Sequence, residues 1–196
     1  MRKIALGLAL AIVLSAAAAS AQTGAGAVST PLLEIAGGYS LVRTSTVVSN
    51  SFNLQGGSIA LAGNVNHWLG FVGDFGYYST KFIPPTGFKL NVASYTFGPR
   101  ISFYHRHRLT LFAHDLLGVG HAGGSLYTAG FSSGTAPPSA TYAFAMLAGG
   151  GVDVTISRRW AIRAFQVDWL YTTFPNGARN RQQNLRLTFG AVFLLH

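Results

Sequence analysis

Residues 142–171 read YAFAMLAGGGVDVTISRRWAIRAFQVDWLY. Every second residue from Tyr142 to Val154 is apolar, and the residues between them are small or polar apart from Leu147. After the basic segment 157–159 the alternation resumes, with Phe165, Val167, Trp169 and Tyr171 on one face and Ala164, Gln166 and Asp168 on the other. Because side chains alternate between the two faces of a strand, the stretch predicts two strands joined by a short turn.

The polar face of this predicted hairpin carries two single charges, Asp153 and Asp168, among glycine, alanine and glutamine. A soluble β-protein buries its large apolar residues and turns its charges to water. Here the large apolar and aromatic residues form one whole face, and the small and charged residues form the other. This arrangement is typical of a membrane-spanning β-barrel, whose outside faces lipid and whose inside is polar.

The amino terminus predicts a secretory signal peptide over residues 1–21. Two basic residues precede a short apolar run, Ile4 to Leu14, and Ala19-Ser20-Ala21 forms a small-x-small cleavage site. The run is shorter than the ~20 residues of a spanning helix, which disfavours a membrane anchor. We therefore expect cleavage before Gln22, a flexible lead over residues 22–32 and one outer-membrane barrel domain over residues 33–196.

The composition restricts the class of protein and of partner. The chain has no cysteine, so it has neither disulfides nor a thiolate metal site. Only 10% of its residues are charged and its mean hydropathy is +0.32, although no later segment is a long unbroken apolar run. Without Arg2 and Lys3, 12 basic residues stand against 5 acidic ones, a net charge of +7. Because the charges form no stripe with interleaved aromatics, we expect anionic lipid headgroups rather than nucleic acid as the partner.

The remaining chain predicts six further strands with the same alternation. They cover residues 33–43, 54–65, 69–78, 89–103, 109–121 and 184–195. Tight turns are expected near His67, Arg106 and Arg158, and longer loops near Ser49, Pro84, Gly134 and Gly177. Short and long connections alternate strictly, which is typical of transmembrane barrels with short periplasmic turns and longer external loops.

Two strands are similar to those of a known family. One contains Tyr95-Thr96-Phe97-Gly98-Pro99 and leads into Arg100, and the other is the closing strand from Leu185 to Phe193. They resemble the strands of the OmpA- and OmpX-like outer-membrane barrels, a porin-type family. The resemblance covers nearly all of the mature chain. It implies an all-β, eight-stranded antiparallel up-and-down transmembrane β-barrel in the bacterial outer membrane, with the long loops facing the exterior and the termini facing the periplasm. Such barrels usually end in an aromatic assembly signal, whereas here three residues follow Phe193.

We expect the barrel to contact outer-membrane lipid and lipopolysaccharide and to be recognised by the barrel-assembly machinery during biogenesis. We expect it to be a monomer and to bind no nucleic acid. An eight-stranded barrel is just wide enough for its side chains to fill it. Inward charges then need partners, because an unpaired charge in a low-dielectric interior is costly. The residues predicted to form this polar network in the lumen are Glu34, Asp74, Arg100, Asp153, Asp168 and Arg186.

Two details of facing are also expected. Asp115 interrupts the alternation of its strand, which suggests a β-bulge there. Arg163 shares the parity of the apolar face in its strand, so it is expected to face outward and to reach the membrane interface with its charged end.

The six histidines do not suggest an enzyme, a cofactor site or a metal site. His105 and His107 flank Arg106 in a turn, and no third ligand is evident. His114 and Asp115 are adjacent in a strand, so they face opposite ways, and no serine accompanies them. We therefore expect a structural or surface-interaction role through the external loops. A narrow porin-like channel is one alternative, and a secreted lipocalin-like carrier is another, which would require apolar residues inside and charges outside.

Overall fold

The structure is a computed structural model that describes residues 30–45, 51–83, 88–105, 108–123, 140–174 and 181–196. The expected signal peptide and nearly all of the expected lead lie outside these ranges, as do the central parts of the four expected loops. The strands are β1 (Leu33–Ser45), β2 (Ser51–Asn64), β3 (Leu69–Ile83), β4 (Phe88–His105), β5 (Leu109–Gly123), β6 (Ala140–Thr155), β7 (Trp160–Thr172) and β8 (Gln182–Leu195).

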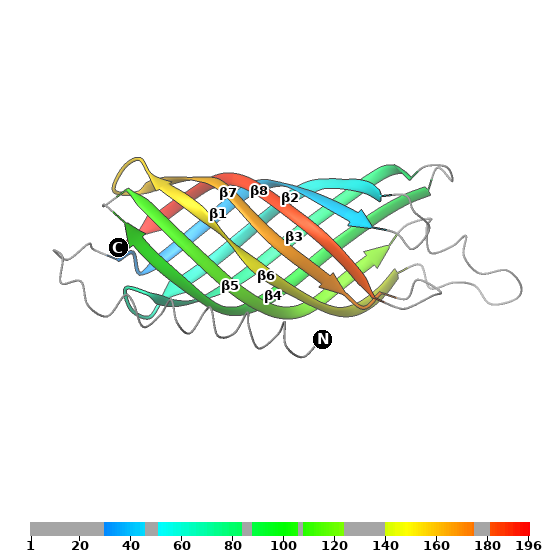
Figure 1. Cartoon of the computed structure of the whole chain (residues 1–196), viewed down its shortest axis with the longest axis horizontal. Helices are drawn as coiled ribbons and strands as arrows, with labels where there is room; N and C mark the ends of the chain where they lie inside the picture. The colour runs from blue at the N-terminus through cyan, green and yellow to red at the C-terminus, as the bar shows by residue number, and fades with distance from the viewer. Residues whose placement is uncertain (1–29, 46–50, 84–87, 106–107, 124–139, 175–180) are drawn as a thin grey trace, which may run out of the picture.

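The eight strands form a closed antiparallel barrel in which each strand pairs with its neighbours in sequence. Closure is made by β1 and β8, which pair from Leu33 with Leu195 to Thr44 with Asn184. Figure 1 shows the strands tilted around one axis, with the β6–β7 turn at the same end as the carboxyl terminus. The predicted fold class is thus confirmed. No helix in the part of the chain described here is long and apolar enough to cross a membrane.

Two tight turns are fixed by polar side chains that bind their own backbone. At the β2–β3 turn, Asn66 Oδ1 accepts hydrogen bonds from the amides of Trp68 (2.9 Å) and Leu69 (2.7 Å). At the β6–β7 turn, Ser157 Oγ accepts a hydrogen bond of 3.2 Å from the amide of Trp160. Asparagine and serine favour such turns because their short side chains replace backbone acceptors.

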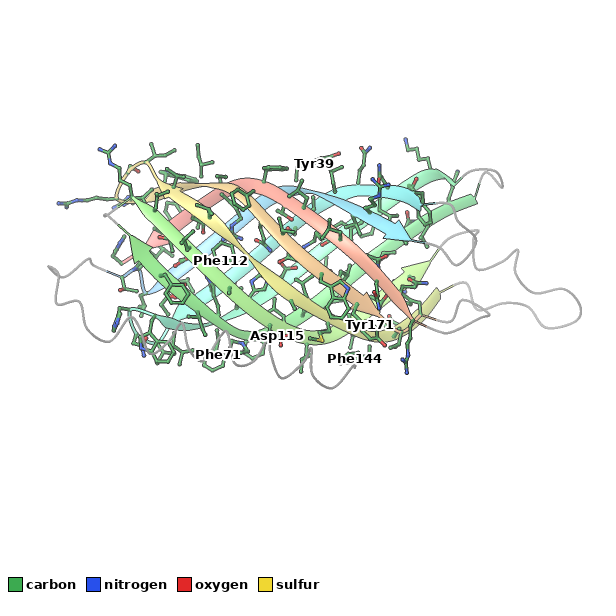
Figure 2. All side chains as sticks on the ribbon, in the orientation of Figure 1. Tyr39, Phe71, Phe112, Asp115, Phe144 and Tyr171 are labelled. Carbon is green, nitrogen blue, oxygen red and sulfur yellow. The ribbon has the colours of Figure 1, made fainter. Side chains whose placement is uncertain are left out.

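The outer face of the barrel is apolar and aromatic. Phe71 of β3 stacks on Phe97 of β4, with ring centroids 5.9 Å apart, and Phe75 packs against Tyr95 at 4.9 Å. Phe97 is 61% exposed. Figure 2 shows side chains of this kind projecting from the barrel wall. These rings belong to a belt of exposed large apolar residues contributed by all eight strands.

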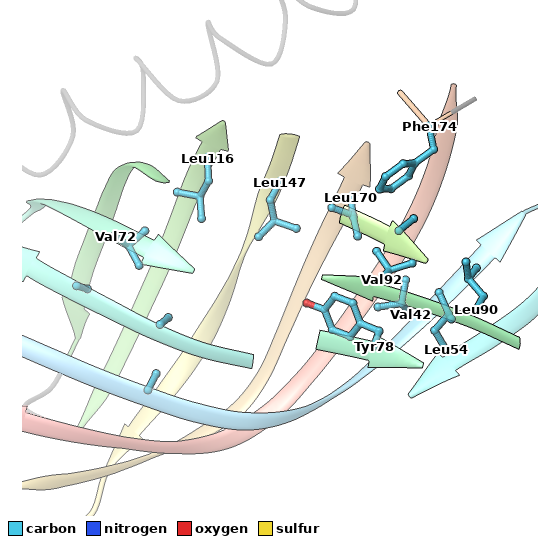
Figure 3. Packing of buried hydrophobic residues seen from close by; sticks show 14 of the residues in the cluster. Val42, Leu54, Val72, Tyr78, Leu90, Val92, Leu116, Leu147, Leu170 and Phe174 are labelled. Carbon is cyan, nitrogen blue, oxygen red and sulfur yellow. The ribbon is translucent and has the colours of Figure 1, made fainter. Parts of the chain in front are cut away.

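The inner face changes character along the barrel axis. Near the long-loop end the lumen is filled by packed apolar side chains from several strands, shown in Figure 3, among them Val42, Leu54, Tyr78, Leu90, Val92, Leu170 and Phe174. Gly76 makes room for this packing, because a Cβ atom there would collide with the hydroxyl of Tyr78. The middle of the barrel and the short-turn end instead hold charged side chains.

Two expectations about the strands are wrong. The first is the direction in which Arg163 and Ala164 face in β7. The pairing of β7 with β8 shifts register between Arg163 and Gln166, and the pairing of β6 with β7 shifts between Val152 and Asp153. A β-bulge therefore turns both Ala164 and Phe165 outward and turns Arg163 into the lumen, where it is 6% exposed. The outward placement of Arg163 and the inward placement of Ala164 are both corrected by this one extra residue.

The second correction concerns Asp115, where a bulge was expected. Strand β5 keeps one register with β6 along its whole length, including the pair Asp115 and Ala148. Inward and outward residues alternate without a break, so His114 and Leu116 face the lumen and Asp115 is exposed on the outer face.

Candidate functional site: the charged interior of the barrel

The upper part of the charged interior, which lies nearer the long loops, is centred on Arg186. Its Nη1 and Nη2 atoms donate to the two carboxylate oxygens of Asp74, at 2.7 and 3.1 Å, and its Nε donates to Asp168 at 2.8 Å. Nη1 also donates to the hydroxyl of Tyr78 at 2.8 Å. Arg186 is fully buried, so its charge depends on these two carboxylates for compensation.

Asp168 accepts from two further donors besides Arg186. His114 Nε2 lies 2.9 Å from its Oδ1 atom, and Gln166 Nε2 donates to its Oδ2 atom at 2.8 Å. Because a carboxylate only accepts, the imidazole is the donor in the first pair. This carboxylate is therefore held by three side chains from β5, β7 and β8.

Arg163 and Arg100 bind the carboxylates in the lower part of the charged interior, which lies nearer the short turns. Arg163 binds Asp153 with two parallel hydrogen bonds, 2.9 Å from Nε and 3.0 Å from Nη2. Arg100 binds Glu34 at 2.7 Å and lies 3.7 Å from Asp153. The ring of Phe112 lies beside both guanidinium groups, with centroid distances of 4.4 Å to Arg100 and 4.5 Å to Arg163. The aromatic face thus attracts two cations in a site with little water.

Gln166 joins the two parts into one network. Its Oε1 atom accepts from Arg163 Nη1 at 2.7 Å while its Nε2 atom donates to Asp168. At the lower end, Asn64 donates to Glu34 at 2.9 Å and to the carbonyl of Pro31 at 2.8 Å. A chain of hydrogen bonds, interrupted by the 3.7 Å ion pair of Arg100 with Asp153, therefore runs from the short-turn end to Tyr78, where the apolar packing begins.

The structure places all six residues named from the sequence in this network: Glu34, Asp74, Arg100, Asp153, Asp168 and Arg186 are each in at least one ion pair. Sequence reasoning missed five other members, Asn64, Tyr78, His114, Arg163 and Gln166. A signal for Arg163 was present, because the large apolar residues change from even positions, Trp160 and Ile162, to odd ones, beginning at Phe165. Such a change of parity inside one strand marks an inserted residue.

The interior has little free space. A cavity of about 10 Å³ lies beside Arg100, His114 and Arg163, and a second of about 10 Å³ lies beside Gly38 and Thr188. Each volume holds roughly one water molecule. Within the described ranges, no cluster of three histidine, cysteine or acidic residues is arranged to hold a metal ion. The geometry is therefore that of a packed scaffold.

The charges are divided between the lumen and the two ends of the barrel. Four of the five acidic residues are in the lumen network, and the fifth is Asp115 on the outer face. The exposed basic residues of the described chain lie at strand ends or in turns. Those near the long loops are Arg43, Lys81, Lys89 and Arg181, and those near the short turns are Arg108, Arg158 and Arg159. Both rims of the barrel are therefore basic and carry no acidic residue.

No known protein-family model and no curated protein matches the chain in sequence. Solved structures do match it in fold. Ail, the attachment invasion locus protein of Yersinia pestis, covers 84% of this chain and 98% of its own with a TM-score of 0.57 and 18% identity.

Two more solved structures give the same result. Neisserial surface protein A covers 83% of this chain and 97% of its own, with a TM-score of 0.60 and 14% identity. The outer-membrane protein OprG of Pseudomonas aeruginosa covers 85% and 97%, with a TM-score of 0.50 and 11% identity. The chain therefore has the fold of the small eight-stranded outer-membrane barrels.

Proposed function

We propose that the protein is an integral outer-membrane barrel of the OmpA- and OmpX-like kind, which acts as a scaffold for surface-exposed loops. The observation that carries this proposal is the outer belt of exposed large apolar residues between two basic rims. Water would not tolerate so much exposed apolar surface, whereas the hydrocarbon core of a bilayer does. The packed, charged lumen supports a scaffold, because it holds the wall rigid from within.

The basic rims are the basis for the proposed lipid partners. Arg43, Lys81, Lys89 and Arg181 are exposed near the long-loop end and give it positive charge. Phosphate groups of lipopolysaccharide in the outer leaflet have the complementary charge. Ail, which has a similar fold, has been solved with the heparin analogue sucrose octasulfate, another polyanion. The barrel-assembly machinery would insert the chain after export.

Loop exposure is the direct test of this role. An epitope tag inserted after Gly134, in the expected loop outside the described residues, should be reached by antibody on intact cells, while a tag after Arg106 should not. Both variants should keep the heat-modifiable gel mobility of a folded barrel. Labelling at Arg106 but not at Gly134 would reverse the proposed orientation, and loss of both folded forms from the membrane fraction would contradict the membrane location.

The channel alternative is opposed by how the lumen is filled. An ion would have to pass the apolar packing around Val42, Leu90 and Leu170, and the free volumes in the charged region hold about one water each. We therefore expect purified barrel in planar bilayers to give no conductance steps above those of protein-free membranes. Steps that scale with added protein and vanish on heating it beforehand would favour the channel.

The secreted carrier is the weaker alternative. A lipocalin-like barrel needs an apolar cavity inside and charges outside. Here the large apolar residues are outside, and seven of the charged residues are inside.

A further inference from the structure

Asp115 is out of place on the outer wall. It is the central member of the outward row of β5, which consists of Leu109, Leu111, Ala113, Asp115, Leu117, Val119 and His121. Figure 2 shows it about midway along the barrel. In the described part of the chain, every exposed lysine or arginine lies at a rim. A single carboxyl group therefore lies at the middle of an otherwise apolar belt.

The backbone beside Asp115 is also short of a hydrogen bond. In the pairing of β4 with β5, Phe97 faces Leu117 and Arg100 faces His114, but the two positions between them are not paired. Pro99 lies in this gap across from Asp115. Because proline has no N–H, it cannot donate to β5 as any other residue there would. The carboxyl group of Asp115 thus lies on the outer wall beside Pro99, a backbone position that has no N–H to donate.

This coincidence is costly in a membrane unless another molecule covers it. The apolar band of such barrels is ~25 Å tall, so the middle lies about 12 Å from either edge, beyond the reach of lipid headgroups. A carboxyl group in hydrocarbon is strongly disfavoured unless another polar group pairs with it. The oxygen atoms of Asp115 therefore need hydrogen-bonding partners that lipid tails do not supply.

We propose that Asp115 marks a homodimer interface, in which it meets Asp115 of a second copy across a two-fold axis. A two-fold axis brings the same residue of each copy together, so the two carboxyl groups can hydrogen-bond to each other instead of facing lipid. A basic side chain of the second copy cannot take this role, because those of the described chain are at the rims, at a different depth. The proposal rests on the membrane location proposed above and departs from the monomer expected from the sequence.

The wall around Asp115 suits a close approach. Its partner on β6 is Ala148, the next outward pair is Ala113 and Gly150, and Pro99 lies opposite on β4. Small residues let two walls in lipid come near enough for short side chains to touch. Larger rings border this patch on both sides: Phe71 pairs with Pro99 on β3, and Trp169 pairs with Ala148 on β7.

The absence of cysteine allows a direct cross-linking test. Ala113→Cys places one thiol beside the proposed axis and leaves Asp115 intact. Gly37→Cys, on β1 at the opposite side of the barrel, is the matched control, because nothing lies within 4 Å of a Cβ atom there. With a short bis-maleimide in liposomes at low protein density, Ala113→Cys should give a covalent dimer and Gly37→Cys only a background of chance collisions.

The carboxyl itself is tested in the Ala113→Cys background. Asp115→Leu should lower the dimer yield by about tenfold, whereas Asp115→Asn, which keeps a donor and an acceptor, should retain most of it. Each variant is first shown to be a heat-modifiable, membrane-inserted barrel, so that failure of the membrane location is seen separately. Equal yields from the two cysteine positions, an unchanged yield in Asp115→Leu, or capture of a different protein at Ala113→Cys in native membranes would overturn the proposal.

Discussion

Replacing Arg186 with methionine is expected to lower the free energy of unfolding by ~3–5 kcal/mol, the usual cost of leaving buried charges without their partner. The change removes four hydrogen bonds and leaves Asp74 and Asp168 facing each other's field in the lumen. His114 and Gln166 still bind Asp168, so Asp74 is the carboxylate left most exposed to this loss. The measurement is urea unfolding in liposomes, followed by tryptophan fluorescence and gel mobility.

Two further variants separate charge compensation from size and hydrophobicity. Arg159→Met makes the same substitution in an exposed turn and should change stability by less than about 0.5 kcal/mol. Adding Asp74→Leu to Arg186→Met removes one orphaned charge and should restore part of the loss, which a double-mutant cycle would measure. If Arg186→Met were as stable as the unmodified chain, the lumen network would not be what holds the interior together.

A charge placed on the outer wall should also be strongly destabilising. Val167 is 40% exposed on the apolar belt, and Val167→Arg should cost ~2–4 kcal/mol if that wall lies in the hydrocarbon core. Val65→Arg is the control, because Val65 is 67% exposed in the β2–β3 turn, beyond the belt. The same substitution there should have little effect on stability in liposomes.

The comparison of Val167→Arg with Val65→Arg tests whether the outer wall faces lipid, rather than whether the fold accepts an added arginine. Both variants start from an exposed valine and add the same side chain, and the strand propensity lost only at Val167, in β7, is at most ~1 kcal/mol, below the expected effect. The folded yield in liposomes and the urea midpoint should both separate the two variants. Equal stability of Val167→Arg and Val65→Arg would mean that the belt is not in a membrane.

Local alternation is what the sequence by itself determined. The period of two in residues 142–154, and in seven other segments, predicted the strands, the outward face of each strand apart from Arg163 and Ala164, and the alternation of short and long connections. Because this information is carried by neighbouring residues, it survives without knowledge of the rest of the fold. It was enough to predict a closed eight-stranded barrel and to assign Glu34, Asp74, Arg100, Asp153, Asp168 and Arg186 to the inner face.

Pairing across the lumen was decided only by the tertiary structure. Arg186 meets Asp74 across 112 residues of chain, and Arg100 meets Glu34 across 66, because the stagger of the strands sets which inward residues share a level. The bulge in β7 is also a property of strand pairing. One extra residue between Arg163 and Gln166 shifts the register with β8, so the residues of β7 before the bulge face the opposite way from a regular strand. Likewise, the absence of a bulge at Asp115 was decided by its uninterrupted ladder with β6, because a bulge is a property of two paired strands.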